Sequence, residues 1–239
     1  MNERTMRTEA ILGEAAIEKL RNSRVAVFGI GGVGGYVVEA LARSGIGALD
    51  LIDSDRVVES NINRQIIAVT DTLGMYKVDA AKQRVLSINP DCRVETHACF
   101  YLPQEKERFD FDAWDYIIDA IDTVTAKLDL ISEAQAHGIP IISSMGCGNR
   151  LDPSRLCVKD IYETSGDPLA KIMRHECRKR GIRRLTVVCS EEEPRPLQFD
   201  LKEKEAGKRR SIPASSPFVP PAAGLLIASR CIMDPIGIR

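Results

Sequence analysis

The sequence predicts an α/β fold in which helices cover both faces of a mostly parallel sheet, and three observations support this prediction. Short apolar runs alternate with helix-like segments over residues 11–143, a pattern typical of such sheets. The glycine-rich turn Gly29-Ile30-Gly31-Gly32-Val33-Gly34 lies between the first of these runs and the helical segment that follows. With 239 residues, 44% of them hydrophobic, the chain is long enough to bury a full core.

The elements of this alternating part are predicted from periodicity and from residues that end helices. RVAVF and ALDLI are apolar runs of strand length, and Asn89-Pro90 and Gly138 end helical segments. The first strand, the glycine turn, the next helix and the second strand form a Rossmann-like βαβ unit. In chain order we expect a helix at 11–21, a strand at 24–28, a helix at 34–44, a strand at 48–52, a helix at 77–88, strands at 93–97 and 116–120, a helix at 125–137 and a strand at 139–143.

After Asn149 the alternation weakens. Asp167 and Pro168 are typical of the N-cap and first position of a helix, which we expect to run to Arg180. A strand is expected at 186–189, and the four prolines and three serines of 211–221 predict a loop before a final buried helix. We expect one domain over 1–239, with a core at about 1–150 and an elaboration at about 151–239.

Composition excludes several classes of protein. The formal net charge of -1 gives no overall nucleic-acid signature. The seven cysteines are odd in number and contain no Cys-x-x-Cys pair, so we expect reduced thiols and no zinc ribbon. Residues 1–20 lack the apolar centre of a signal peptide, and the apolar stretch 222–233 is shorter than the roughly 20 residues of a membrane span. We therefore expect a cytoplasmic protein without a membrane partner.

The glycine turn predicts a nucleotide site within the core at 1–150. Its glycines allow close backbone approach to phosphates at a helix N-terminus, and Asp53, at the end of the second strand, has the spacing of a ribose-binding acid. NAD would satisfy these features as well as ATP. The segment Asn61-x-Asn63-Arg64-Gln65 favours ATP, because attack on a phosphate needs cationic and hydrogen-bonding groups.

Three further residues are candidates for this site, each with an ordinary structural alternative. Asp122 follows a predicted strand at the carboxyl edge of the sheet, where its carboxylate could hold Mg²⁺ beside phosphates. It could instead cap the helix that follows. Asp55 could be a solvated or capping acid, and Lys77 an exposed helix lysine.

The ordered set of motifs resembles the ubiquitin-activating enzyme superfamily, which includes the bacterial enzymes that adenylate sulfur-carrier proteins. Within it, the chain most resembles the tRNA threonylcarbamoyladenosine dehydratases over nearly its whole length. The segments that carry the resemblance are Gly29-x-Gly31-Gly32-x-Gly34, Asp53-x-Asp55, Asn61-x-Asn63-Arg64-Gln65, Lys77, Asp119-Ala120-x-Asp122, Ile88-Asn89-Pro90-Asp91-Cys92, Asp152-Pro153-Ser154, Asp167-Pro168-Leu169-Ala170 and Ser215-Ser216-Pro217-Phe218-Val219-Pro220.

The resemblance implies roles for these residues. The glycine loop and Asp53 would bind ATP, while Asn61, Arg64 and Lys77 would contact its phosphates. Asp122 would bind Mg²⁺. In dimeric relatives an N-terminal arginine reaches the partner's nucleotide site, and this residue matches Arg7 and, less closely, Arg4.

The resemblance also implies a reaction. A carboxylate of threonylcarbamoyladenosine in tRNA would attack ATP and form an acyl-adenylate, and a nucleophile within the same modification would then close a ring with net loss of water. Such an intramolecular step requires no enzyme thiol. Relatives that transfer sulfur or acyl groups use a cysteine, and a sulfur-carrier or cysteine desulfurase partner would need one. The candidates are Cys147, Cys177 and Cys189.

Two basic segments are candidate tRNA contacts. Residues 171–184 contain seven lysines and arginines and a single acid, Glu176. Lys208, Arg209 and Arg210 precede the proline-rich loop. Both segments could also be solvated surface.

We expect an ATP- and Mg²⁺-dependent homodimeric dehydratase, a ligase-like enzyme. The alternatives are activation of a sulfur-carrier or ubiquitin-like C-terminus, an NAD-dependent oxidoreductase, and a nucleotide-sensing module without catalysis.

Overall fold

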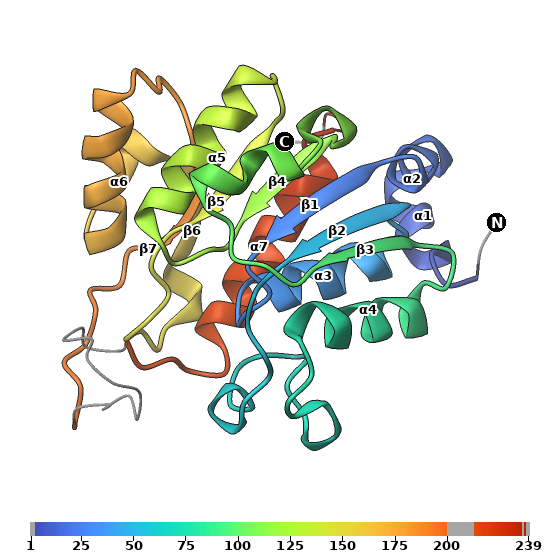
Figure 1. The fold of residues 1–239 in the computed structure, drawn as a ribbon, viewed down its shortest axis with the longest axis horizontal. Coiled ribbons are helices and arrows are strands. Elements are labelled where there is room, and N and C mark those ends of the chain that lie inside the picture. Colours follow the sequence, from blue (N-terminus) through green and yellow to red (C-terminus); the bar gives the residue numbers. More distant parts are fainter. Residues whose placement is uncertain (1–2, 200–212, 236, 238–239) are drawn as a thin grey trace.

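A seven-stranded sheet organises the computed structural model, which describes residues 3–199, 213–235 and 237 (Figure 1). The strand order is β3-β2-β1-β4-β5-β7-β6, and β6 alone is antiparallel to its neighbour. This confirms the predicted α/β class with a mostly parallel sheet. The strands are β1 (Arg24–Phe28), β2 (Ala48–Ile52), β3 (Arg93–His97), β4 (Tyr116–Asp119), β5 (Ile141–Ser144), β6 (Leu156–Asp160) and β7 (Thr186–Ser190).

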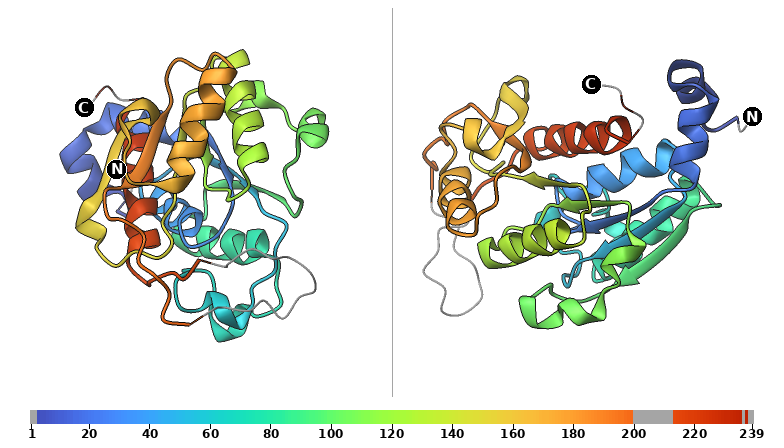
Figure 2. Two further views of the ribbon diagram at one scale, coloured as in Figure 1. Left: turned by 90° about the vertical axis from the view of Figure 1, so that its left-hand side faces the viewer. Right: turned by 90° about the horizontal axis from the view of Figure 1, so that it is seen from above.

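Helices cover both faces of the sheet, and α3 and α7 lie on the face opposite α5 (Figure 2). Alternate residues of β1 enter different cores: Val25 and Val27 pack with α3 and α7, whereas Ala26 and Phe28 pack with α5. A third cluster joins α5 to α6 and β7. The helices are α1 (Met6–Leu12), α2 (Glu14–Arg21), α3 (Gly34–Arg43), α4 (Lys77–Ile88), α5 (Val124–Ala136), α6 (Pro168–Lys179) and α7 (Val219–Met233).

Most predicted elements are present with ends within one or two residues of the expected positions, but three predictions were wrong. The helix expected at 11–21 is two helices, because Gly13 has a φ of 86° that interrupts the helical backbone. Strand β6 was missed, since it is half-buried along its length and has no clear alternation. Val219, Pro220 and Pro221 belong to α7, because proline is tolerated in a first helical turn.

The direction of the parallel strands determines at which end of the sheet the site lies. All parallel strands end at one edge, while α1 and α2 lie at the opposite end, where the strands begin (Figure 1). In the part of the chain that the structure describes, no helix is long and apolar enough to cross a membrane.

Candidate active site

A pocket of about 440 Å³ lies at the carboxyl ends of β1, β2 and β4. It brings together nearly all the residues predicted for ATP, although they are distributed over more than ninety positions of the sequence. The lining residues include Gly29, Gly31, Gly32, Asp53, Asp55, Asn61, Arg64, Gln65, Lys77, Cys99 and Asp122. A larger cavity of about 800 Å³, lined by several arginines, lies at the other end of the sheet and contains none of the predicted ATP residues.

Glycines are required in the loop after β1 because the backbone is packed closely. A Cβ on Gly29, whose φ is 89°, would lie 2.6 Å from the carbonyl oxygen of Ala120. A Cβ on Gly34 would lie 1.8 Å from the carbonyl oxygen of Gly29. Gly31 has a different use, since its Cβ would meet only the Gln65 amide, at 3.9 Å. Its open side leaves space for a ligand phosphate.

Asp53 lies at the end of β2 and connects three parts of the pocket. Its Oδ2 accepts a hydrogen bond from Ile30 N at 2.7 Å, and its Oδ1 accepts one from Asp55 N at 2.8 Å. Burial raises the pKa of Asp53, and the opposing effect of Lys77 and these two N–H groups offsets only part of the increase. Lys77 Nζ lies 4.0 Å from Asp53 Oδ2 and donates to Asp55 Oδ2 at 2.7 Å.

Lys77 is therefore not the exposed helix lysine that its position in the sequence allowed. Its side chain is 7% exposed, whereas that of its partner Asp55 is 63% exposed. The cation is held in the pocket by a carboxylate that can turn toward solvent.

Three residues of the segment 61–65 line the same pocket as Lys77. Arg64 donates from Nη1 to Ser60 O at 3.0 Å and to Asn63 Oδ1 at 2.9 Å, and burial lowers its pKa. Asn61 is buried and caps its own turn. Gln65 is also buried, and its Oε1 has no hydrogen-bond partner. The sequence prediction included Gln65 in the segment that favours ATP but gave it no individual role, although it lines the pocket.

Asp122 is exposed on the rim of the pocket, in the loop between β4 and α5. Asp119, which is fully buried, stabilises this loop by accepting a hydrogen bond from Ile121 N at 3.2 Å. Lys127, also fully buried, donates to Asp119 Oδ2 at 3.0 Å. The sequence prediction missed Lys127, because a lysine within a helix is ordinarily exposed.

The donor set around Asp122 fits a magnesium ion held beside nucleotide phosphates. Among the described residues, no group of three or more His, Cys, Asp or Glu could hold a metal alone. Mg²⁺ does not need one, because it is commonly bound by one or two carboxylates together with phosphates and water. Asp122 supplies one such carboxylate at the open side of the pocket.

The cysteines proposed for catalysis lie away from this pocket. Cys147, Cys177 and Cys189 are buried, and burial raises their pKa values to about 11, about 11 and about 12. Cys99 does line the pocket, and burial raises its pKa too. Thiols with raised pKa values are poor nucleophiles at neutral pH.

Neither N-terminal arginine lines the nucleotide pocket of its own chain. Arg7 is exposed on α1. Arg4 donates to Ile88 O at 3.3 Å and lines the arginine-rich cavity at the far end of the sheet.

The basic segment 171–184 is divided between internal contacts and open surface. Arg174 donates to Thr164 O, while Lys179 and Arg180 pair with Glu176. Four other cations are exposed and have no ion pair within the described ranges: Lys171, Arg178, Arg183 and Arg184. Of these, Arg178 lies over the ring of Tyr162. The second segment, Lys208 to Arg210, lies outside the described residues.

Comparison with known proteins shows which family and which relatives the chain resembles. The ThiF family matches residues 3–205. A tRNA threonylcarbamoyladenosine dehydratase from Bacillus subtilis strain 168 is 42% identical over 95% of this chain and 92% of its own length. Two crystal structures of the E. coli tRNA N6-threonylcarbamoyladenosine dehydratase each cover 98% of this chain and 94% of their own. The AMP complex is 32% identical with a TM-score of 0.89, and the ATP complex is 31% identical with a TM-score of 0.88.

Proposed function

The chain belongs to the ThiF family, and from this premise we propose that it is a tRNA threonylcarbamoyladenosine dehydratase that uses ATP to cyclise N6-threonylcarbamoyladenosine in tRNA. The observation that carries the proposal is the pocket at the strand ends. It brings the glycine loop and Asp53 together with the cations Arg64 and Lys77. The chain that forms it resembles such dehydratases over nearly its whole length.

The pocket residues divide the work of binding ATP. The open backbone at Gly31 lies where phosphates can approach the N-terminus of α3, and Asp53 is placed to accept hydrogen bonds from a ribose. We assign Arg64 and Lys77 to the phosphates, because both cations line the pocket together with the glycine loop. For Lys77 to reach a phosphate it exchanges Asp55 for the ligand, a change that moves an exposed carboxylate and leaves the buried cation in place.

The reaction has two steps. The substrate carboxylate attacks the α-phosphorus, forming a P–O bond and expelling pyrophosphate, while Arg64 and Lys77 neutralise the charge on the leaving group. A nucleophile within the same modification then attacks the acyl carbon, and AMP leaves with the former carboxylate oxygen. The nucleophile loses its proton, so the nucleoside loses one water in total. Because this attack is intramolecular, it needs neither a thiol nor a sulfur-carrier or desulfurase partner.

Asp122 is the residue that we propose for magnesium. A bound Mg²⁺ would supply positive charge to the phosphates during departure of pyrophosphate. The hydrogen bonds of Asp119 and Lys127 would fix the loop that carries this carboxylate.

We further propose that the enzyme acts as a homodimer in the cytoplasm. Arg7 lies on α1 at the far end of the sheet, so it can serve a nucleotide pocket only in a second copy. A cytoplasmic location agrees with seven free cysteines.

The direct test is incubation with ATP, Mg²⁺ and tRNA that carries threonylcarbamoyladenosine, followed by nucleoside mass analysis and assay of AMP and pyrophosphate. Arg64→Ala and Asp122→Ala should each lower the rate about a hundred- to a thousandfold, because each removes stabilisation of developing charge. Arg155→Ala is the control and should keep the wild-type rate, because Arg155 lies on the surface in a short turn before β6. Production of ADP and phosphate, or turnover with NAD alone, would disprove the proposal.

A further inference from the structure

A second pocket, of about 500 Å³, is lined in part by Ser215, which is hydrogen-bonded to Asn63, the neighbour of Arg64 in the sequence. Three segments that are distant in sequence form it: the loop after β5, residues 195–199 after β7, and residues 214–216 before α7. None of its residues was predicted to have a role, and none belongs to the pocket proposed for ATP.

Asn149 joins the three segments. Its backbone N donates to Ala214 O at 2.7 Å, and its Oδ1 accepts from Ala214 N at 2.7 Å. Its carbonyl oxygen accepts from Arg195 N at 2.8 Å. Asn149 has a φ of 59°, and among the described residues it is the only one other than glycine with a positive φ. Strained backbone of this kind persists where surrounding contacts fix it, often beside ligands.

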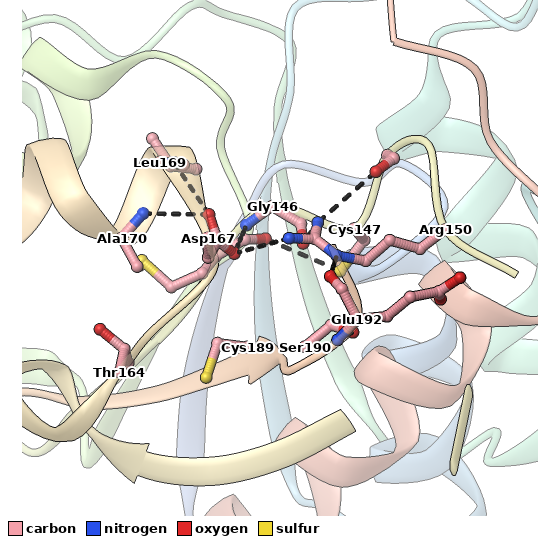
Figure 3. Close-up of polar contacts among 12 residues, drawn as sticks. Gly146, Cys147, Arg150, Thr164, Asp167, Leu169, Ala170, Cys189, Ser190 and Glu192 are labelled. Carbon is pink, nitrogen blue, oxygen red and sulfur yellow. Dashed lines mark hydrogen bonds and ion pairs between the residues drawn. The ribbon is translucent and has the colours of Figure 1, made fainter. Parts of the chain in front are cut away.

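A buried polar network that includes Arg150, Asp167 and Glu192 lies next to the pocket (Figure 3). Arg150 is 2% exposed, donates from Nε to Glu192 O at 2.8 Å and lies 3.6 Å from Asp167 Oδ2. Asp167 caps α6 and also accepts from Gly146 N at 3.0 Å. The network therefore fixes the loop after β5 to α6 and β7, so the pocket has a rigid base.

A short chain of contacts connects the two pockets. Asn63 Nδ2 donates to Ser215 O at 3.0 Å, and Asn63 Oδ1 accepts from Arg64 Nη1 at 2.9 Å. Ser215 lines the second pocket, whereas Arg64 lines the first. A group held in the second pocket would therefore lie next to the cation that faces the phosphates of ATP.

The open side of the second pocket has the chemistry of a nucleotide-binding surface. Phe199 is 73% exposed and lies close to the apolar side chains of Pro196 and Leu197. The side chain of Arg195 is 61% exposed, and its partner Glu192 also accepts hydrogen bonds from two backbone N–H groups. Exposed aromatic rings stack on unpaired bases, and arginine pairs with the phosphates between them.

We propose that this pocket binds the modified adenosine of the tRNA, with its base on Phe199 and an adjacent phosphate on Arg195, so that its carboxylate points past Asn63 toward ATP. The proposal rests on the proposed function, because it assigns the nucleic-acid substrate of the same reaction to a defined surface. Arg150 and Asn149 are positioning residues that keep the pocket in shape.

The test compares Phe199→Ala, Phe199→Tyr and Arg195→Ala with the wild-type full-length protein. Two quantities are measured: kcat/KM for cyclisation, and the affinities for threonylcarbamoylated and unmodified tRNA of the same sequence. Phe199→Ala should lower kcat/KM roughly tenfold and reduce the preference for modified tRNA, because the protein then stacks on one base fewer. Phe199→Tyr should restore both, since it keeps the ring.

Arg195→Ala should weaken the binding of both tRNAs equally. It should also reduce the slope of log affinity against log salt concentration by about one, as expected for the loss of a single phosphate contact. Leu225→Ala is the matched control, because Leu225 is 49% exposed and lines neither pocket. ATP affinity should not change in any variant. A Phe199→Ala protein with wild-type kcat/KM and wild-type preference overturns the proposal, as does a wild-type protein that binds both tRNAs equally. Absence of cyclic product with wild type would instead disprove the proposed function, and the binding preference would still decide the role of the pocket.

Discussion

Two buried lysines near the sheet differ in the exposure of the carboxylates that pair with them. Lys77 and Lys127 are both almost inaccessible, yet each is paired with a carboxylate, as buried charges must be. Their partners differ in exposure. Asp119 is fully buried with Lys127, which makes a structural pair, whereas Asp55 is mostly exposed, and we propose that it releases Lys77 to a ligand. The same ionic contact therefore supports two different roles.

The three buried candidate thiols and the half-buried thiol of Cys99 give a prediction at this scale. Alanine in place of Cys99, Cys147, Cys177 or Cys189, one at a time, should leave the rate of ring closure within about an order of magnitude of wild type, because the nucleophile belongs to the substrate. Single-turnover assays of each folded variant provide the measurement. A folded variant that has lost all activity would indicate a covalent thioester or persulfide step.

A second residue-scale prediction concerns stability. Asp50, on β2, is buried and accepts hydrogen bonds from Arg24 Nε at 2.6 Å and from His97 Nε2 at 3.2 Å. Burial alone would raise the pKa of Asp50, but the hydrogen bonds from His97 and Arg24 outweigh it and the pKa is lowered. A lowered pKa in the folded state stabilises the protein at pH values above the unfolded value, about 3.9 for Asp, and this contribution is lost as the pH falls through the folded value.

Asp50→Asn should therefore lower the free energy of unfolding by about 2 kcal/mol near neutral pH, where the variant lacks the charged hydrogen bonds. The difference from wild type should shrink as the pH falls below about 4. Urea denaturation over a series of pH values measures it, with Asp71→Asn as an exposed control. A difference that stays constant with pH would show that the carboxylate charge is not responsible.

At the scale of elements, α6 and the turn after it combine a packed face with a charged one. Ala170, Met173 and Cys177 face the third core cluster. The opposite side carries cations, but Glu176 and Thr164 engage three of them. Of the other four, Arg178 lies over the ring of Tyr162, whereas Lys171, Arg183 and Arg184 are exposed without such a contact and could bind phosphates.

Replacing these three residues with alanine should weaken tRNA binding and lower the slope of log affinity against log salt by about 0.9 for each phosphate that the variant no longer neutralises. ATP affinity should stay the same, because the nucleotide pocket is unchanged. Replacing Lys179 and Arg180, which are paired with Glu176, gives the control and should have less effect. Equal slopes for the triple variant and the wild type would show that these three residues do not contact tRNA phosphates.

At the scale of the whole molecule, both parts of the chain share one sheet. Strands β7 and β6 continue the sheet directly from β5, so we propose that the described part of the chain forms one domain. The N-terminal helices lie at the end of the sheet opposite the nucleotide pocket (Figure 1). This separation underlies the proposal that Arg7 acts in a second copy.

Mixed dimers test that proposal. Arg7→Ala and Arg64→Ala homodimers should each be nearly inactive, but co-expression of the two chains with different tags should restore roughly a quarter of wild-type activity. Half of the dimers would then be mixed, each with one intact site. A mixture that is no more active than its parents would show that Arg7 does not act across a dimer.

The sequence by itself determined the parallel sheet, the glycine loop and most of the nucleotide pocket. These depend on local rules: strand and helix periodicity, the need for glycine where backbone segments approach closely, and the meeting of parallel strand ends at one edge. Asp53, Arg64 and Asp122 could therefore be placed near one another from their positions relative to predicted strands. The break at Gly13 and the edge strand β6 could not, because their local patterns are weak.

Only the tertiary structure decided the environments of individual side chains. Lys127 is buried because Asp119 and β5 surround it, and Arg150 is buried because Asp167 and Glu192 do. Asn63 meets Ser215 across 152 positions of sequence, so no local pattern predicts the wall between the two pockets. Periodicity specifies which face of an element is apolar, whereas the partner of a polar group depends on packing between segments that are far apart in the chain.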